Sequence, residues 1–286
     1  MPSVTSCIAE GTVRLGMGPH ADRARMDCEL LLMHVLERNK AWIMTHGEDD
    51  VPEEAWGRLV ELLERRYRGE PIQHLTGECE FYGLPFKVTR DVLVPRPDTE
   101  HLVEKVVELA QRFARPRIVD IGTGSGAIAV SLAHTLPDAY VTATDLSELA
   151  LAVAGENAAR NQVGGRVRFV HGDLLAPVAG EQFDIVASNP PYVPNTERAL
   201  IAVEVREYEP ALALFGGEDG LDVYRRLIPA AFAVLAPDGF LALEIGFSQA
   251  QAVQDLLEAA GFVEPELTAD LQGIPRVVSA RRPGGA

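Results

Sequence analysis

The sequence is poor in cysteine and in basic residues. Its three cysteines, Cys7, Cys28 and Cys79, stand without metal-ligand spacing, so we interpret them as reduced thiols and expect no metal site. Lysine and arginine together number 26, against 42 aspartates and glutamates, which leaves a formal net charge of -16. A chain this acidic is not expected to have the broad basic surface that binds phosphates, so we expect no direct contact with nucleic acid.

Long apolar runs, repeats and low-complexity tracts are also missing. Glu10, Arg14 and Asp22 interrupt the apolar residues near the N-terminus, so we expect neither a signal peptide nor a membrane span. The only low-complexity tract is a short polar tail at residues 281–286. Because 47% of the 286 residues are hydrophobic, the chain can form a large core and a smaller one. We expect a cytoplasmic, monomeric protein of two domains that does not bind membranes.

Helical periodicity marks the first part of the chain. Between residues 21 and 68, apolar side chains such as Leu31 and Val35 recur at helical spacing, with charges between them. Pro52 is followed by two glutamates, which is typical of a helix start, because proline suits the first turn and carboxylates favour the positive end of the helix dipole. Residues 1–78 are therefore predicted to form a small helical domain that docks a partner.

Apolar strands alternate with helical stretches in the rest of the chain. Residues 79–97, in which Gly83 and Pro85 interrupt aromatic and apolar positions, predict a β-hairpin linker. Residues 98–286 predict an α/β domain with a seven-stranded, Rossmann-like parallel sheet covered by helices on both faces. The predicted strands are residues 117–121, 140–144, 167–170, 183–187, 240–245, 262–267 and 276–280.

A glycine-rich turn follows the first of these strands. It reads Gly122-Thr123-Gly124-Ser125-Gly126 and leads into a helix. Glycines let a ligand approach the backbone, and a helix N-terminus offers N–H groups and partial positive charge to an anion. The spacing is one residue tighter than the dinucleotide fingerprint, which favours a ligand with one carboxylate over a pyrophosphate. A glycine turn that binds no ligand is an equally good interpretation at this point.

Acidic residues follow the next two strands. Asp145 ends the second strand, where a carboxylate would accept hydrogen bonds from ribose hydroxyls. The alternative is a helix-capping role, because Ser147 and Glu148 follow it. Asp173, after the third strand, could accept a hydrogen bond from an adenine amine while Leu174 packs on the ring, although an aspartate in a surface turn is nearly as good an interpretation. A nucleoside with a carboxylate tail fits both positions.

The fourth strand runs into Ser188-Asn189-Pro190-Pro191-Tyr192 at the edge of the sheet where open α/β folds bind ligands. An amide or aromatic amine is a poor nucleophile because its lone pair is delocalised, so it must be held in position. The side-chain oxygen of Asn189 and the carbonyl of Pro190 could each accept one N–H of a planar NH2 group. Pro190 and Pro191 stiffen the loop, and the Tyr192 ring could stack on the acceptor. A proline-rich turn with Tyr192 covering the sheet edge is the alternative.

Taken together, seven blocks of this sequence resemble the PrmC/HemK family of peptide chain release factor N5-glutamine methyltransferases. The resemblance covers residues 69–280, and its blocks are FYGLPF at 81–86, VPRPDTE at 94–100, DIGTGSG at 120–126, SNPPY at 188–192, YEP at 208–210, GGEDGL at 216–221 and LEIG at 243–246. Asn-Pro-Pro-Tyr alone is also found in adenine-amine methyltransferases. The VPRPDTE and GGEDGL blocks therefore carry the finer assignment.

The resemblance implies a class I methyltransferase domain at residues 98–286 that uses S-adenosyl-L-methionine. It implies methylation of the glutamine in the Gly-Gly-Gln motif of release factors, with the helical domain helping to dock the factor. The predicted catalytic residues are Asn189, Pro190 and Tyr192, and the substrate site adds Pro191. The predicted cofactor residues are Gly122, Thr123, Gly124, Ser125, Gly126, Asp145, Asp173, Leu174 and Asn189. Two alternatives stay open, an adenine-amine methyltransferase acting on nucleic acid and a non-catalytic binding protein.

Overall fold

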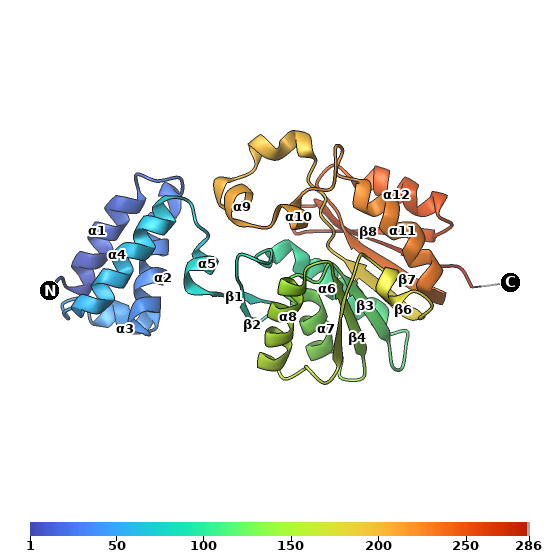
Figure 1. The fold of residues 1–286 in the computed structure, drawn as a ribbon, viewed down its shortest axis with the longest axis horizontal. Helices are drawn as coiled ribbons and strands as arrows, with labels where there is room; N and C mark the ends of the chain where they lie inside the picture. The colour runs from blue at the N-terminus through green and yellow to red at the C-terminus, as the bar shows by residue number, and fades with distance from the viewer. Residues whose placement is uncertain (285–286) are drawn as a thin grey trace. The chain divides into compact units, whose positions relative to one another are not determined.

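The N-terminal residues fold into helices, as their apolar spacing predicts (Figure 1). The structure is a computed structural model that describes residues 1–284, so the last two residues of the predicted polar tail lie outside it. Leu31, Leu59 and Leu63 are at most 1% exposed and form the centre of the helical core. The helices are α1 (Val4–Leu15), η1 (Ala21–Arg23), α2 (Ala24–Leu36), α3 (Lys40–Thr45), α4 (Glu53–Tyr67) and α5 (Ile72–Thr76).

A segment from much later in the sequence completes this helical unit. Residues 201–208 belong to the same compact unit as residues 1–78, whereas the sequence-based division places them in the second domain. The reason lies in Arg66, which is 1% exposed and therefore needs acceptors inside the protein. Its Nε donates to Asp27 at 2.7 Å and its Nη1 to Glu204 at 3.0 Å. We call residues 1–78 and 201–208 the helical unit, and the other described residues the sheet unit.

A seven-stranded sheet forms the centre of the sheet unit, as predicted (Figure 1). The order is β5-β4-β3-β6-β7-β9-β8, in which β9 is antiparallel to both of its neighbours and the other pairs are parallel. Ile121 at the end of β3 pairs with Thr144 on β4 and with Ser188 on β6. Because these strands end level and the order reverses between β3 and β6, the loops that follow them meet at one edge. The strands are β3 (Arg117–Ile121), β4 (Tyr140–Asp145), β5 (Val167–His171), β6 (Phe183–Ser188), β7 (Leu235–Glu244), β8 (Val263–Ala269) and β9 (Pro275–Arg281).

Helices cover both faces of the sheet, with a hydrophobic core under each. Alternate residues of β3 point to opposite faces, so Ile118 belongs to one core and Val119 to the other. The first core includes residues of α6 (Glu100–Ala110) and α7 (Ala127–Thr135), and α8 (Glu148–Arg160) packs beside α7 and against β4 and β5. The second core includes residues of α11 (Asp222–Val234) and α12 (Ala250–Ala259).

The β-hairpin is shorter than predicted. Its strands, β1 (Glu78–Phe81) and β2 (Leu84–Lys87), pair with each other, and Phe81 and Phe86 are buried in the first core. Residues 88–96 form no strand, although the prediction continued the hairpin through them. Val92 is nevertheless buried, because it packs against Ala150 and Val153 of α8.

Short elements complete the sheet unit and the segment inserted in it. They are η2 (Pro97–Thr99), η3 (Ala176–Val178), η4 (Asn195–Leu200), α9 (Val203–Tyr208) and α10 (Ala211–Leu214), of which α9 lies in the helical unit. None of the helices in residues 1–284 combines the length and the apolar character that crossing a membrane requires.

Candidate functional site

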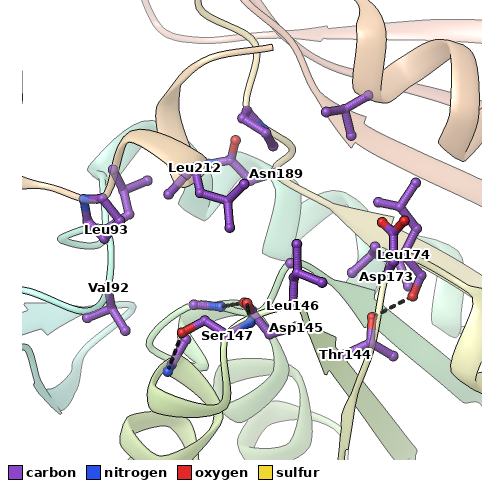
Figure 2. Close-up of a pocket in the computed structure, with 18 of the residues that line it drawn as sticks. Val92, Leu93, Thr144, Asp145, Leu146, Ser147, Asp173, Leu174, Asn189 and Leu212 are labelled. Carbon is purple, nitrogen blue, oxygen red and sulfur yellow. Dashed lines mark hydrogen bonds between the residues drawn. The ribbon is translucent and has the colours of Figure 1, made fainter. Parts of the chain in front are cut away.

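A cavity of about 200 Å³ opens where the carboxyl ends of β3, β4 and β6 meet. Figure 2 shows Asp145 and Ser147 on one side of it and Asn189 and Leu212 across from them. Of the predicted site residues, the cavity is lined by Gly122, Gly124, Asp145, Asp173, Leu174, Asn189 and Pro191. The structure thus brings together predicted residues from four separate parts of the sequence.

The glycine turn divides into residues that face the cavity and residues that support it. Gly122 and Gly124 line the cavity with φ of +70° and +57°, and a Cβ on either would meet no protein atom within 4 Å. Crowding by the protein therefore does not require glycine here, whereas the positive φ favours it at both positions. The N–H groups of Gly122 and Thr123 donate to the carbonyl of Thr144, at 2.9 and 3.0 Å, which holds the turn against β4.

Thr123, Ser125 and Gly126 do not line the cavity, although the prediction included them in the cofactor set. Ser125 accepts a hydrogen bond from Asn157 at its carbonyl, at 2.8 Å. A Cβ on Gly126 would lie 3.0 Å from the Cβ of Ala154, so glycine lets α7 approach α8 closely. These three residues therefore support the turn on the side that faces away from the cavity.

Thr123 is bonded to a buried carboxyl group beneath the turn. Its hydroxyl donates to Oδ2 of Asp120 at 2.6 Å. Burial raises the pKa of Asp120 to about 7, and the hydrogen bond from Thr123 opposes part of that rise. Asp120 lies inside the motif that the sequence analysis quoted, but it was not predicted as a site residue.

Asp145 is fixed by two backbone donors. Its Oδ2 accepts from the N–H of Gly124 and its Oδ1 from the N–H of Ser147, both at 2.8 Å. Capping of α8 was the alternative role for Asp145. Ser147 has this role instead, because its hydroxyl accepts from the N–H of Ala150 at 3.1 Å. An ionised carboxylate has about four acceptor positions, so Asp145 can still accept two hydrogen bonds from a ligand in the cavity.

Asp173 and Leu174 lie at the side of the cavity, as Figure 2 shows. Asp173 forms an ion pair with Arg226, and its side chain is 49% exposed. It therefore has the exposure of a residue in a surface turn, although it also lines the cavity. Leu174 has a φ of +49°, an uncommon conformation for a residue with a Cβ. The hydroxyl of Thr144 donates to its carbonyl at 3.0 Å and holds it there.

Most of the apolar residues that line this cavity were not predicted from the sequence. Val92, Leu93, Leu146 and Leu212 line it and surround Asp145 and Asn189 with apolar surface (Figure 2). Leu146 and Leu212 are 50% and 61% exposed. The sequence signal for Leu146 was its position directly after the acid that ends a strand. No sequence signal marks Leu212, whose position depends on the fold.

Asn189 and Tyr192 each form a partly buried side-chain hydrogen bond. The Nδ2 of Asn189 donates to the hydroxyl of Thr99 at 3.0 Å, and the hydroxyl of Tyr192 donates to Oε1 of Glu244 at 3.4 Å. Burial and the neighbouring Glu244 raise the pKa of Tyr192, and burial raises the pKa of Glu244 to about 7. Thr99 and Glu244 stand in blocks that carry the family resemblance, but neither was predicted as a site residue.

Pro190 and Tyr192 do not line the cavity. Pro190 is buried, and the carbonyl of Tyr192 accepts from Nε2 of Gln249 at 2.9 Å. The hydroxyl of Tyr192 points to Glu244 inside the protein, and its ring packs against the second core. The interpretation that Tyr192 covers the sheet edge therefore fits this conformation. In residues 1–284, no three His, Cys, Asp or Glu side chains are grouped so that they could hold a metal ion.

The chain matches two family models and a set of full-length relatives. Residues 98–206 match a methyltransferase small domain, and residues 9–77 match a PrmC N-terminal domain. The release factor glutamine methyltransferase of Moorella thermoacetica is 43% identical over 281 residues, which cover 98% of this chain and 99% of the relative. That of Deinococcus radiodurans is 45% identical over 260 residues, or 91% of this chain and 92% of the relative.

Two solved structures share the fold at low sequence identity. A methyltransferase from Pyrococcus furiosus covers 71% of this chain and 90% of its own, with a TM-score of 0.52 and 21% identity. The catalytic domain of human Mettl16, solved with an RNA hairpin, covers 80% of this chain and 82% of its own, with a TM-score of 0.57 and 17% identity.

Proposed function

This chain belongs to the release factor glutamine methyltransferase family, and we propose that it methylates the side-chain amide nitrogen of a glutamine in a peptide chain release factor. The methyl donor is S-adenosyl-L-methionine. We further propose that the target glutamine lies in the Gly-Gly-Gln motif, that the reaction takes place in the cytoplasm, and that the helical unit docks the release factor. The match of residues 9–77 to the PrmC N-terminal domain supports the docking role.

The orientation of Asn189 is the observation that carries this proposal. One N–H of its NH2 group donates to the hydroxyl of Thr99, and its oxygen takes no part in that bond, so the oxygen can accept a hydrogen bond from a substrate. Asn189 lines the same cavity as Asp145 and the glycine turn. An acceptor in this position can bind one N–H of a substrate amide and direct the amide nitrogen toward the donor. The carbonyl of Pro190 is the proposed second acceptor.

The cavity suits a nucleoside that carries a charged tail. Asp145 offers fixed acceptors for ribose hydroxyls, and Gly122 and Gly124 leave room where side chains would otherwise project. Leu146 and Leu174 supply apolar surface for the base, which is the role we propose for them. When bound, S-adenosyl-L-methionine would supply an electrophilic methyl group to the amide nitrogen that Asn189 holds. The carbon–sulfur bond would break as the carbon–nitrogen bond forms, and the proton that the nitrogen loses would pass to water.

The protein contributes position more than acid–base chemistry in this proposal. The Tyr192 hydroxyl is directed to Glu244, and burial raises its pKa. The hydroxyl therefore stays protonated, and we do not assign Tyr192 as the proton acceptor of the reaction. We propose that its ring shapes the acceptor site. Among the residues that line the cavity, Asp145 is held by backbone donors and Asp173 by Arg226. Orientation by Asn189 is therefore the main catalytic contribution we assign.

Transfer of tritium from labelled S-adenosyl-L-methionine tests the proposal. We expect label in intact release factor and none in a release factor whose target glutamine is replaced by alanine. DNA and RNA that contain adenine serve as competing substrates, because an acceptor for a planar NH2 group would also suit adenine. Label in the nucleic acids and none in the release factor would overturn the glutamine assignment.

A further inference from the structure

Three polar side chains lie behind residues 188–192, which we call the acceptor loop. Thr99 ends η2, Asn189 follows β6, and Glu244 ends β7. Ser188 pairs with Leu243, so Asn189 and Glu244 are the next residues along two neighbouring strands. Thr99 is 5% exposed and Glu244 is 2% exposed, which removes both from competition with water.

Thr99 alone cannot decide which way the Asn189 amide faces. The Nδ2 of Asn189 donates to Oγ1 of Thr99 at 3.0 Å in this structure. A hydroxyl can both donate and accept, so it could equally donate to Oδ1 of a flipped amide. A third group must take the Thr99 proton if the observed direction is to be preferred.

Glu244 is placed to take that proton. Its Oε2 is buried and has no hydrogen-bond partner of good geometry in this conformation, while Oε1 accepts from Tyr192 at 3.4 Å. The Thr99 hydroxyl is near enough to lower the pKa of Glu244 by hydrogen bonding. An ionised carboxylate only accepts, so a proton given to it leaves the Thr99 oxygen as an acceptor for Asn189.

We propose that Glu244 and Thr99 are positioning residues that set the direction of the Asn189 amide and so present its oxygen to the substrate. This inference rests on the function proposed above and adds two residues to the same site. In this proposal the chain of donors runs from Asn189, which donates to Thr99 at 3.0 Å, to Thr99, which would donate to the unpartnered Oε2 of Glu244. If Glu244 is protonated or lost, the chain can reverse, and a flipped Asn189 presents NH2 to the NH2 of the substrate.

The surroundings of Glu244 predict how pH acts on this chain of donors. Burial is the largest influence and, with Asp98, raises the pKa of Glu244 to about 7, while hydrogen bonds from Thr99 and Tyr192 and the charge of Arg276 oppose the rise. Two further groups lie near Glu244 and its partner Tyr192. Tyr224 donates to the Glu244 carbonyl at 2.8 Å, and the charge of Arg96 opposes the rise in the pKa of Tyr192. The carboxylate form, and with it the productive amide direction, is therefore lost as pH falls below about 7.

The test uses Thr99→Val, Thr99→Ser and Glu244→Gln in the full chain, with Glu156→Gln as a control. Glu156 is an exposed carboxylate of the same unit, paired with Lys87 outside the cavity. We expect Thr99→Val and Glu244→Gln to lower kcat on release factor by roughly tenfold or more, with KM for S-adenosyl-L-methionine within about twofold. Thr99→Ser should recover most of the loss, and the control should resemble the parent.

Two pH readouts separate positioning from a merely structural role. The kcat of the parent should rise with pH through about 7, and Glu244→Gln should remove that limb. In the infrared spectrum, the parent should show C=O bands of buried carboxyl groups that titrate near the same pH. Glu244→Gln should lose the part due to Glu244, whereas the part due to Asp120, whose pKa burial also raises to about 7, should remain. Parent-like kcat and pH profile in Thr99→Val or Glu244→Gln would overturn the inference.

The same measurements separate this inference from the function on which it rests. The parent alone decides whether release factor glutamine is methylated. The infrared titration needs neither substrate nor cofactor, so it still tests the state of Glu244 if the parent proves inactive on release factor. Titrating bands that are the same in the parent and in Glu244→Gln between about pH 6 and 8 would then count against the inference.

Discussion

Replacing Asp145 by asparagine should weaken cofactor binding more than its small change in shape suggests. Both carboxylate oxygens accept backbone N–H groups at 2.8 Å, one from Gly124 and one from Ser147. An asparagine keeps one oxygen and turns an NH2 group toward one of these donors. One backbone N–H then loses its acceptor and meets another donor, which disturbs either the glycine turn or the start of α8.

The magnitude follows from the bonds that change. A hydrogen bond to a charged group contributes roughly 1.5 to 3 kcal/mol. Asp145→Asn turns charged acceptors into neutral ones and loses one acceptor position, so we expect a loss of about 2 kcal/mol, or roughly thirtyfold in affinity. Asp145→Ala removes both acceptors and should lose about 3 kcal/mol, more than a hundredfold.

Isothermal titration with S-adenosyl-L-methionine measures this effect without a release factor. Glu156→Gln is the control, because Glu156 is an exposed carboxylate of the same unit that pairs with Lys87 outside the cavity. We expect the control to lose less than about threefold in affinity, since exposed ion pairs contribute little. Affinity in Asp145→Asn equal to that of the control would refute the assignment of Asp145 as the main polar contact of the ribose.

Three further predictions concern the acceptor, the turn and the helical unit. Asn189→Ala should lower kcat by roughly a hundred- to thousandfold, with calorimetric cofactor affinity nearly kept; full activity would place the acceptor elsewhere. Gly126→Ala should cost about 1 to 3 kcal/mol in urea unfolding, because φ is +81° and the new Cβ would lie 3.0 Å from Ala154; an unchanged midpoint would contradict this. Arg66→Ala should cost about 3 to 5 kcal/mol, because it leaves the buried Asp27 with only its longer ion pair to Arg23, whereas a loss below about 1 kcal/mol would show that water replaces the guanidinium.

The alternation of strands and helices could be predicted because its signal is local. The second strand was predicted at residues 140–144 and runs from Tyr140 to Asp145, and the fourth was predicted at 183–187 and runs from Phe183 to Ser188. Both are buried on two faces, so they appear as short apolar runs. The fourth strand runs one residue beyond the predicted apolar run, to the polar Ser188, and both Asp145 and Ser188 pair within the sheet.

The predictions were wrong where burial comes from tertiary contacts. Residues 88–96 have the apolar positions of a strand, but Val88 and Val92 are buried against α8 and pair with no strand. Residues 201–208 follow the acceptor loop in sequence, yet Glu204 belongs with Arg66 in the helical unit. Neither partner could be identified from one sequence, because neither packing contact repeats at a regular spacing.

The candidate site shows the same limit at the level of single residues. A motif predicts that a ligand-binding turn exists, but the role of each letter depends on neighbours that are distant in sequence. Gly126 has the same identity as Gly124 and stands two positions away, yet it faces Ala154 while Gly124 faces the cavity. Asn189 was predicted as a hydrogen-bond acceptor from its motif alone. The direction of its amide depends on Thr99, which stands 90 positions earlier and comes from another block of the chain. Residues that orient a motif are therefore best sought among the buried polar partners of its side chains.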